Sequence, residues 1–421
     1  MLRVLLRILI VFPLMLHSQD ARSSEQLVTQ HGAVPDDDQS DTKAIQTAIA
    51  AAAEEDGGIV RFPAGVFLAG GLQLKGNITL QLDEDAVLMG SRDHRDYGDG
   101  RWSQALIKGD GLRGICIRGP GTIDGADCKN PDGEEGFRGP HGILLTDCQD
   151  ITISNVTIKR TGNYAILCRR CRNAQLKKLT ICGGHDGLHA QACQDFEVRA
   201  CDFRTGDDSY AGCDNVDFKI IDCQINSSCN GFRLGCVNLL VKQCRIWGPG
   251  EYQHQVSSRK NMLSAFVHFA PKDRQPKLPS DNWLIEDVTI DNVGFVYGYD
   301  IERGLWQKGQ PAKRLRFHNV KATNVEQPLR VWGDPDREFQ LTLENVSIAL
   351  RDDRRNQPVL DLKRFGALTL RNVTLDNSGT RPVVRASDGK LVSVEHVTCV
   401  SANSVPYDLD DIDRVVGLQD E

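Results

Sequence analysis

Four polar residues near the middle of the chain have types and spacings that suit acid/base chemistry. Asp186, Asp208 and Asn230 recur at intervals of 22 residues, and Asp207 lies next to Asp208. Crowded carboxylates repel one another, which raises the pKa of at least one of them and leaves it protonated near neutral pH. A proton donor beside a base is the pair that hydrolysis of a glycosidic bond requires. Acidic turn residues in contact with water, or a Ca²⁺ site, are the alternatives.

A repeated strand pattern predicts that these residues lie close together. Asp186, Asp208 and Asn230 each follow, by seven residues, a marker position in this pattern. Neighbouring parallel strands lie about 4.8 Å apart, so equal phase in successive copies predicts one outward column of side chains. The closely spaced copies have their markers at Val156, Leu179, Cys201, Cys223 and Cys244, and later copies have them at Val288, Val320, Val346, Val373 and Val397.

The repeats predict an all-β fold, a right-handed parallel β-helix. Because each copy returns to the same phase, stacked copies must run parallel, as in a solenoid built from strands. An N-terminal capping α-helix is expected from Asp41, as its N-cap, to the glycines at 57–58, and it would close one end of the solenoid. We expect one β-helix domain over residues 24–405 and an acidic C-terminal tail over residues 406–421.

The start of the chain and its charge predict an exported, soluble protein. Residues 1–20 contain an apolar run that is too short to span a membrane and resembles a secretory signal peptide. The protein would then be secreted or periplasmic, without stable membrane association. A net charge of −7 disfavours nucleic acid as a partner. A locally basic cleft could still bind an acidic polysaccharide, and we expect a monomer with a polysaccharide substrate.

The cysteines predict internal columns rather than a disulfide framework. Cysteine packs as a small buried apolar residue, and many of the fourteen share a phase of the repeat. There is no pair of C-x-x-C motifs and no histidine pair at ligand spacing nearby, so neither a metal site nor a cofactor is expected. The cysteines that open successive coils are Cys148, Cys171, Cys193, Cys213 and Cys236.

Three segments resemble glycoside hydrolase family 28, the polygalacturonase family, within the pectate-lyase-like β-helix superfamily. RTGDDSYA resembles the family's Gly-Asp-Asp motif, and HDG at 185–187 resembles its Asn-Thr-Asp motif at the expected distance. The opening segment GAVPDDDQSDTKAIQTAIAAAAEEDGGIVRFPAGVFLAG resembles the first helix and strand of the superfamily. The resemblance implies that Asp207 is the general acid. It implies that Asp186 and Asp208 hold and deprotonate a water, with inversion at the sugar carbon.

Departures from the family pattern concern the residues that bind substrate. Asn230 stands where the family usually has a histidine, and the family's Arg-Ile-Lys clamp is absent as such. Arg233, or Arg259 with Lys260, could substitute, because a guanidinium fork suits a carboxylate or a sulfate. The other predicted substrate-binding residues are His185, His189 and Tyr210. His189 and Arg233 share a phase of the repeat, and His254 and His268 lie in an inserted segment that could form a cleft wall.

The main hypothesis is an exported glycoside hydrolase that cleaves a uronic-acid-containing, pectin-like polysaccharide by inverting hydrolysis. One alternative is a polysaccharide lyase on the same scaffold, in which carboxylates bind Ca²⁺ and an Arg or Lys abstracts a proton. The other alternative is a non-catalytic β-helix that binds carbohydrate as an adhesin, and Asn230 in place of histidine is its best support.

Overall fold

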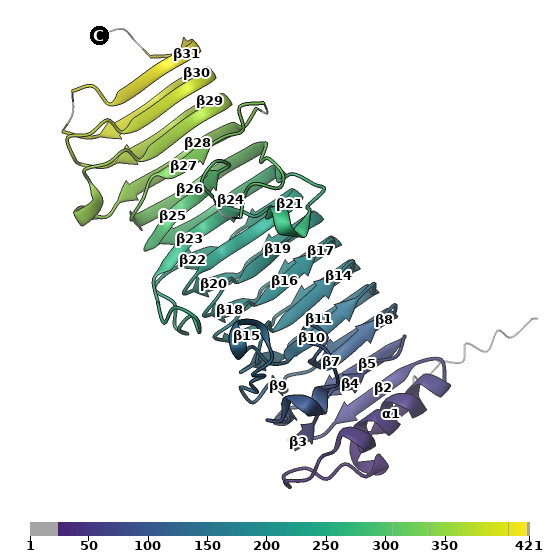
Figure 1. The fold of residues 1–421 in the computed structure, drawn as a ribbon. Coiled ribbons are helices and arrows are strands. Elements are labelled where there is room, and N and C mark those ends of the chain that lie inside the picture. The colour runs from purple at the N-terminus through teal and green to yellow at the C-terminus, as the bar shows by residue number, and fades with distance from the viewer. Residues whose placement is uncertain (1–23, 305, 337, 403, 419–421) are drawn as a thin grey trace, which may run out of the picture.

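The described part of the chain is all-β, as predicted (Figure 1). The computed structural model describes residues 24–304, 306–336, 338–402 and 404–418, so the predicted signal peptide at residues 1–20 lies outside it. Strands pair in parallel with strands of the preceding and following coil, and the pairings form three columns along the molecule.

The first column contains β1 (Ser24–Leu27), β2 (Gly58–Phe62), β5 (Ile78–Leu82), β8 (Arg113–Arg118), β11 (Gln149–Ser154), β14 (Arg172–Lys177), β17 (Gln194–Arg199), β19 (Tyr210–Ile221), β21 (Asn230–Lys242), β24 (Asp281–Asp291), β26 (Arg314–Val325), β28 (Gln340–Leu350), β29 (Leu360–Asp376), β30 (Val384–Val400) and β31 (Tyr407–Val416). The second contains β3 (Gly65–Ala69), β6 (Ala86–Gly90), β9 (Thr122–Asp124), β12 (Thr157–Lys159), β15 (Thr180–Gly183), β18 (Asp202–Thr205), β20 (Gln224–Ser227) and β22 (Arg245–Trp247), with the last parts of β24, β26, β28, β29 and β30. The third contains β4 (Leu72–Gln73), β7 (Ala105–Asp110), β10 (His141–Thr146), β13 (Ile166–Arg169), β16 (Leu188–Gln191), β23 (Met262–His268), β25 (Val293–Asp300) and β27 (Leu329–Trp332), with the first parts of β19, β21, β29, β30 and β31.

Alternating apolar residues explain why these segments form strands around a core. Every second residue of β2 and β5 is buried, since successive side chains of a strand point to opposite faces. The inward side chains stack from coil to coil, as in the pair Phe196 and Phe218, whose ring centroids are 4.9 Å apart. The result is one hydrophobic core that continues through the coils.

The residue before each marker position makes the bend between the first and second columns. Asn345 and Asn372 have φ values of 54° and 52° there, a left-handed conformation that asparagine tolerates better than most residues. The Asn372 amide donates to Asn345 Oδ1 at 3.1 Å, and the Asn345 amide donates to Asn319 Oδ1 at 3.1 Å. These asparagines therefore form a ladder along the outside of the stack.

All fourteen cysteines lie in the described residues and are free thiols. The marker cysteines Cys201, Cys223 and Cys244 are buried in one column, as the repeat predicts. The predicted column of coil-opening cysteines contains one error. A register irregularity in β19 places Asn215, and not Cys213, opposite Cys236.

The predicted helix is α1, Thr42–Glu54, which packs against β1, β2 and β4 beside the first coils. The helix begins where expected, but Asp41 makes no side-chain cap. Its carboxylate instead accepts hydrogen bonds from the backbone N–H groups of Val34 at 2.8 Å and Leu68 at 3.1 Å. Asp41 therefore ties the segment before the helix to β3. Within the described residues, no helix has the length and apolar character needed to cross a bilayer.

The stack continues beyond residue 405, where an acidic tail was expected. Residues 407–416 form β31, which pairs in parallel with β30 from Tyr407 opposite Val384 to Val416 opposite Ser393. The acidic residues led to the prediction of a tail, but they lie on exposed positions of the strand. Leu409 and Ile412 pack partly against the core.

Candidate active site

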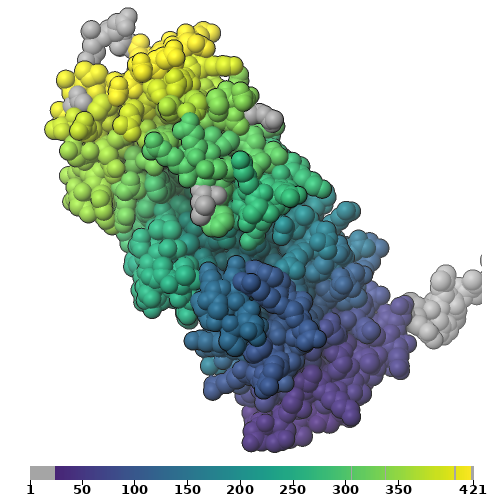
Figure 2. Space-filling model, in the orientation of Figure 1, coloured from purple at the N-terminus to yellow at the C-terminus, as the bar shows by residue number. Residues whose placement is uncertain are grey.

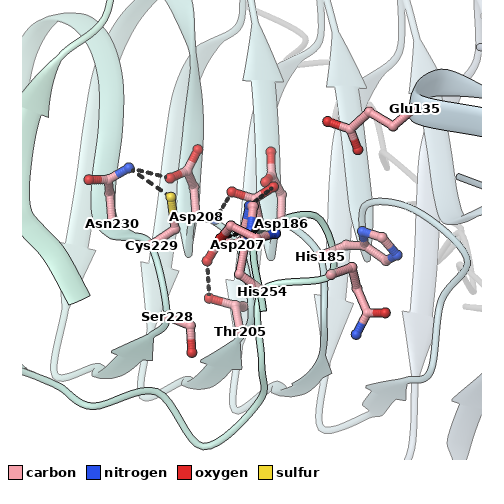
Figure 3. Close-up of polar contacts among 12 residues, drawn as sticks. Glu135, His185, Asp186, Thr205, Asp207, Asp208, Ser228, Cys229, Asn230 and His254 are labelled. Carbon is pink, nitrogen blue, oxygen red and sulfur yellow. Dashed lines mark hydrogen bonds and ion pairs between the residues drawn. The ribbon is translucent and has the colours of Figure 1, made fainter. Parts of the chain in front are cut away.

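The turns between the second and third columns bring the three predicted carboxylates together. Asp186 lies between β15 and β16, and Asp207 and Asp208 lie between β18 and β19. One oxygen of each carboxylate lies within 4.8 Å of the others, and Figure 3 shows the three side chains side by side. The equal phase of the repeats explains why the carboxylates meet. It places the two turns side by side on neighbouring coils, where the backbone N–H of Gly187 donates to Asp208 O at 2.9 Å.

Asp208 is the most buried member of the cluster and is held by its neighbours. Its Oδ1 accepts a hydrogen bond from Asn230 Nδ2 at 2.7 Å, and its Oδ2 pairs with Arg233 Nε. Arg233 Nη2 also lies 4.0 Å from Asp186 Oδ2. Asn230 Oδ1 accepts from Ser264 Oγ at 2.5 Å. Asn230 and Arg233 thus bind to the cluster itself, and Asn230 does so from one coil further along the stack.

Asp186 combines one bonded and one unpartnered oxygen. Its Oδ2 accepts from His189 Nδ1 at 2.9 Å, while its Oδ1 has no hydrogen-bond partner among the described residues. His189 stacks on Tyr164 with ring centroids 4.5 Å apart, and its Nε2 lies 3.1 Å from Arg274 Nη1. Ala211 pairs with both His189 and Arg233 in the strand register, as the shared phase predicts. The free oxygen of Asp186 is an acceptor for a water or a sugar hydroxyl.

Asp207 faces two cationic or hydrogen-bonding groups from segments outside the coils. Arg138 Nη2 lies 3.0 Å from Asp207 Oδ2, and His254 Nε2 lies 3.5 Å from the same oxygen. Arg138 comes from the segment before β10, and His254 comes from the inserted segment between β22 and β23. The backbone carbonyl of Asp207 accepts from Thr205 Oγ1 at 2.8 Å and Ser227 Oγ at 2.6 Å, which fixes the turn.

The cluster divides its charge unevenly, as crowding predicts. Burial raises the pKa of Asp186 to about 7, the charge of Asp207 adds to this, and Arg233 opposes it. Burial also raises the pKa of Asp208 to about 7, with Arg233 opposing and the other two carboxylates adding. Burial acts in the same direction on Asp207, but the His254 hydrogen bond and the Arg138 and Arg233 charges outweigh it and hold the pKa of Asp207 well below its usual range. In the free protein, Asp207 is therefore ionised.

A cavity of about 640 Å³ opens over the cluster. Figure 2 shows the surface hollowed between the blue segment before β10 and the green coils. Asp186 and Asp207 line the cavity, and Asp208 lies beneath them. The cationic residues that line it are Arg138, Arg233, Arg259, Arg274, Arg303 and Arg330.

The remaining predicted substrate residues have different positions. Arg259 lines the cavity and donates to the Ser228 carbonyl at 3.0 Å. Lys260 is exposed outside the lining, with its Nζ 3.4 Å from Glu251 O, because the chain turns outward there. His185 lines a separate neighbouring cavity, and its Nδ1 lies 3.3 Å from Arg138 Nη1.

Tyr210 was predicted to contact sugar, and this prediction is wrong. Its side chain is 1% exposed and stacks in the core between Phe203 and Phe232, with ring centroids 4.8 and 4.7 Å away. Tyr210 begins β19, and the alternation of the strand points it inward. His268 is likewise internal, with its ring nitrogens on Ser280 Oγ and Gln310 O.

Sequence reasoning missed Arg138, Arg274, Arg303 and Arg330 entirely. Arg138 lies in a Gly- and Pro-rich break between strands, so no repeat phase relates it to the aspartates. The length of that break, between β9 and β10, was the available signal, since long loops on a rigid scaffold often carry functional residues. His254 was noted only as a possible wall residue, and the fold brings it to Asp207.

Comparisons with known proteins confirm the predicted resemblance to polygalacturonases. A family model described as rhamnogalacturonase A/epimerase, pectate lyase-like, matches residues 27–233. The chain is 30% identical over 217 residues to a protein of Vitis vinifera named "Probable polygalacturonase", which covers 45% of this chain and 44% of that protein. The chain thus spans less than half the length of the first curated relatives that it matches.

Solved structures agree on the fold. An exopolygalacturonase from Thermotoga maritima superposes with a TM-score of 0.64 at 17% identity, over 80% of this chain and 88% of that one. A surface adhesin of Streptococcus pneumoniae, PfbA, superposes with a TM-score of 0.55 at 14% identity, over 92% of this chain and all of that one (100%). At these identities the likeness concerns the fold alone, so it does not separate a hydrolase from an adhesin.

Proposed function

We propose that this chain is a glycoside hydrolase that cleaves a uronic-acid-containing polysaccharide of the pectin kind. The observation that carries the proposal is the meeting of Asp186, Asp207 and Asp208 within 4.8 Å at the floor of an arginine-lined cavity. The raised pKa values of Asp186 and Asp208 leave a proton on the cluster near neutral pH, and the lowered pKa of Asp207 leaves an ionised carboxylate beside it. The resemblance to polygalacturonases supports the same chemistry.

The proposed roles follow the resemblance and involve one proton shift. Asp186 and Asp208 hold the attacking water, for which Asp186 Oδ1 is the free acceptor. Asp207 protonates the leaving oxygen, although it is ionised in the free protein. A bound uronate adds negative charge beside Asp207, which raises its pKa and favours transfer of the cluster's proton to it.

Inversion at the sugar carbon is part of the proposal. The nearest oxygens of the cluster, within 4.8 Å, are closer than the roughly 6.5–9.5 Å usual between acid and base in inverting enzymes. The water therefore has to be held against the cavity side of Asp186 instead of between the carboxylates. NMR of the first anomer released checks this, and a retained anomer would show that one carboxylate acts as a nucleophile.

Acidic sugars are favoured because several arginines in the cavity lack carboxylate partners. No described carboxylate forms an ion pair with Arg274 or Arg303. Arg303 lies over the Trp332 ring at 5.0 Å, and Arg274 contacts His189. Guanidinium groups bind carboxylates through paired N–H donors, so these two are the proposed contacts to uronate groups.

A lyase that uses Ca²⁺ is less consistent with the contacts of the cluster. Arg233 already pairs with Asp208 and approaches Asp186, and Arg138 pairs with Asp207. A divalent cation would have to bind where these guanidinium groups already balance the charge. The contacts therefore favour proton chemistry.

The fold and location complete the proposal. We infer that the three columns form a right-handed parallel β-helix, since crossover connections between parallel strands are right-handed in about 98% of cases. We also infer that α1 caps its first coil, because Ile45, Ala48, Ile49 and Ala52 bury against it. Export follows from the predicted signal peptide at residues 1–20.

A polysaccharide panel tests the function directly. We expect new reducing ends from polygalacturonate without a rise in ultraviolet absorbance, and unchanged activity in a chelator. An absorbing unsaturated product together with loss of activity in the chelator would indicate the lyase. Binding without any product from pectic or algal uronate polymers, unchanged in Asp207→Asn, would indicate a carbohydrate-binding protein.

A further inference from the structure

The carboxylate cluster lies at one end of its cavity. Asp186 and Asp207 line it from the turns after β15 and β18, and the lining continues through Ser264 on β23 and Phe295 on β25 to Arg330 on β27. The open space thus extends from the cluster toward the C-terminal coils. On the N-terminal side, the cavity is bounded by the segment of residues 126–140, which we call the end wall.

Arg138 of the end wall fills the space beside the cluster. Its side chain is only 6% exposed. Its Nη2 lies 3.0 Å from Asp207 Oδ2, its Nε lies 2.7 Å from Glu135 Oε2, and its Nη1 lies 3.4 Å from Asn163 Oδ1. The guanidinium therefore joins the end wall to Asp207, one of the catalytic carboxylates.

The end wall is anchored to the coils and has a fixed shape. The backbone N–H of Asn130 donates to Phe137 O at 3.1 Å, and that of Gly139 donates to Gly162 O at 2.9 Å. The Asn130 amide also donates to Gln104 Oε1 at 3.0 Å. A Cβ on Gly139 would lie 1.9 Å from Cys128 O, so the backbone packs too closely for any side chain. These contacts hold Arg138 in place.

A second cavity of about 340 Å³ lies on the other side of the end wall. It is lined by Phe137, His185 and Gln255 among others, and none of the three carboxylates reaches it. Figure 3 shows His185 on the far side of the cluster from Asn230. The surface groove is therefore interrupted at the site of chemistry.

We propose that the enzyme acts on chain ends, because the end wall and Arg138 stop a polysaccharide from continuing past Asp186 and Asp207. Cleavage inside a polymer requires room for sugars on both sides of the broken bond. Here sugars have room on the C-terminal side, whereas on the side of the end wall Arg138 is in direct contact with Asp207. This inference rests on the proposed hydrolase function and identifies Arg138 as its specificity-determining residue.

Product analysis on polygalacturonate tests the inference separately from the function. We expect products of one or two sugars from the first time point, with viscosity falling slowly for each bond cleaved. An early ladder of intermediate oligosaccharides with a rapid fall in viscosity would overturn chain-end action while leaving the hydrolase in place. Absence of hydrolysis on every uronate polymer would instead contradict the function.

Opening the end wall gives the second test. Residues 131–136 can be replaced by Asn-Gly, since Asn130 and Phe137 already face each other as in a hairpin. This variant and Arg138→Ala should raise the viscosity loss per bond cleaved several-fold, a ratio that does not depend on total activity. Lys129→Ala, in the same segment but lining the second cavity, should keep the wild-type ratio. A folded, open variant that still releases only the smallest products would contradict the role of the end wall.

Discussion

His254 Nε2 lies 3.5 Å from Asp207 Oδ2, while Nδ1 of the same ring accepts a hydrogen bond from the backbone N–H of Ser257 at 3.0 Å. A backbone N–H can only donate, so the neutral ring carries its hydrogen on Nε2, where it points to Asp207. The turn is closed by the backbone N–H of His254, which donates to Arg259 O at 3.1 Å. The inserted segment thus holds one donor on the carboxylate that Arg138 also contacts.

Replacing His254 should therefore change both rate and pH dependence. His254→Ala removes a hydrogen bond to a charged group, which is worth about 1.5–3 kcal/mol, so kcat should fall about 10- to 100-fold. The basic limb of the pH profile should move upward, because without this donor the pKa of Asp207 rises and the cluster keeps its proton to higher pH. Other groups that face this pair are Arg138, Arg233, His185, Asp186, Cys229 and Arg259.

His254→Gln keeps an N–H donor and should recover part of the lost rate and most of the pH shift. His318→Gln, on the outer face near Glu286, is the matched control and should match the wild type. Equal losses in His254→Gln and His254→Ala, with unchanged pH profiles, would show that the ring only fills space.

Each carboxylate of the cluster should be needed for hydrolysis. Asp186→Asn, Asp207→Asn and Asp208→Asn should each lower kcat by about 10²–10⁴-fold, the usual contribution of acid/base groups. Because the three act as one unit, a double variant should lose little more than the worst single one. Asp202→Asn, whose carboxylate pairs with Arg204 on the outside, should leave the rate unchanged. A fully active Asp207→Asn would remove the proposed mechanism.

The pH dependence of kcat/KM follows from the shared proton. The cluster has to hold one proton, and the pKa values of Asp186 and Asp208 are raised to about 7. Activity should therefore be lost as pH rises through about 7, where that proton leaves. Activity should also fall as pH drops below about 7, because Asp186 and Asp208 are then both protonated and neither can deprotonate the water. An initial-rate profile that rises from pH 7 to 9 would contradict this assignment.

Arg303 should bind substrate without taking part in the chemistry. Arg303→Ala should raise KM for polygalacturonate about 10-fold or more and change kcat little, since a charge-assisted hydrogen bond is lost in both the bound and transition states. The rise in KM should be smaller on methyl-esterified polymer, which lacks the carboxylate. Arg351→Ala, whose side chain pairs with Glu326 away from the cavity, provides the control.

Tyr210→Phe should leave activity unchanged, because the ring lies in the core and not in the cavity. The hydroxyl has no oxygen or nitrogen partner, only the Cys223 thiol, a weak one. The free energy of unfolding should therefore change by less than about 1 kcal/mol. Thermal unfolding and initial rates check both statements, and a raised KM would restore Tyr210 as a sugar contact.

Periodicity explains which parts of the molecule could be predicted. Asp186, Asp208 and Asn230 share one phase, so their meeting follows from the strand repeat alone. The prediction for Tyr210 was wrong for the same physical reason. Strand β19 begins at Tyr210, two residues after Asp208, and the alternation of the strand turns its side chain inward. The prediction for Cys213 was wrong because this residue precedes its marker Cys223 by ten positions, whereas the other coil-opening cysteines precede theirs by eight, the place that Asn215 holds.

Residues outside the repeat could not be placed. Arg138 and His254 reach Asp207 from irregular segments, whose path depends on close backbone packing, such as Gly206 against Gln253 O. Their contacts join residues 69 and 47 positions apart. The secondary-structure propensities of single residues do not predict contacts between residues so far apart in the sequence. The predicted catalytic residues came from the repeat, as did Arg233, whereas Arg138 and His254, which lower the pKa of Asp207, came from irregular segments.

Strand β31 bears on whether two molecules associate end to end. β31 pairs with β30 on one edge, and no described strand covers its other edge. An open edge of this kind is a template for end-to-end polymerisation. Asp408, Asp410 and Asp413 on this strand are exposed, so two such edges would bring like charges together. We therefore expect these aspartates to oppose end-to-end association, and exchanging them for threonine should promote fibre growth visible by light scattering.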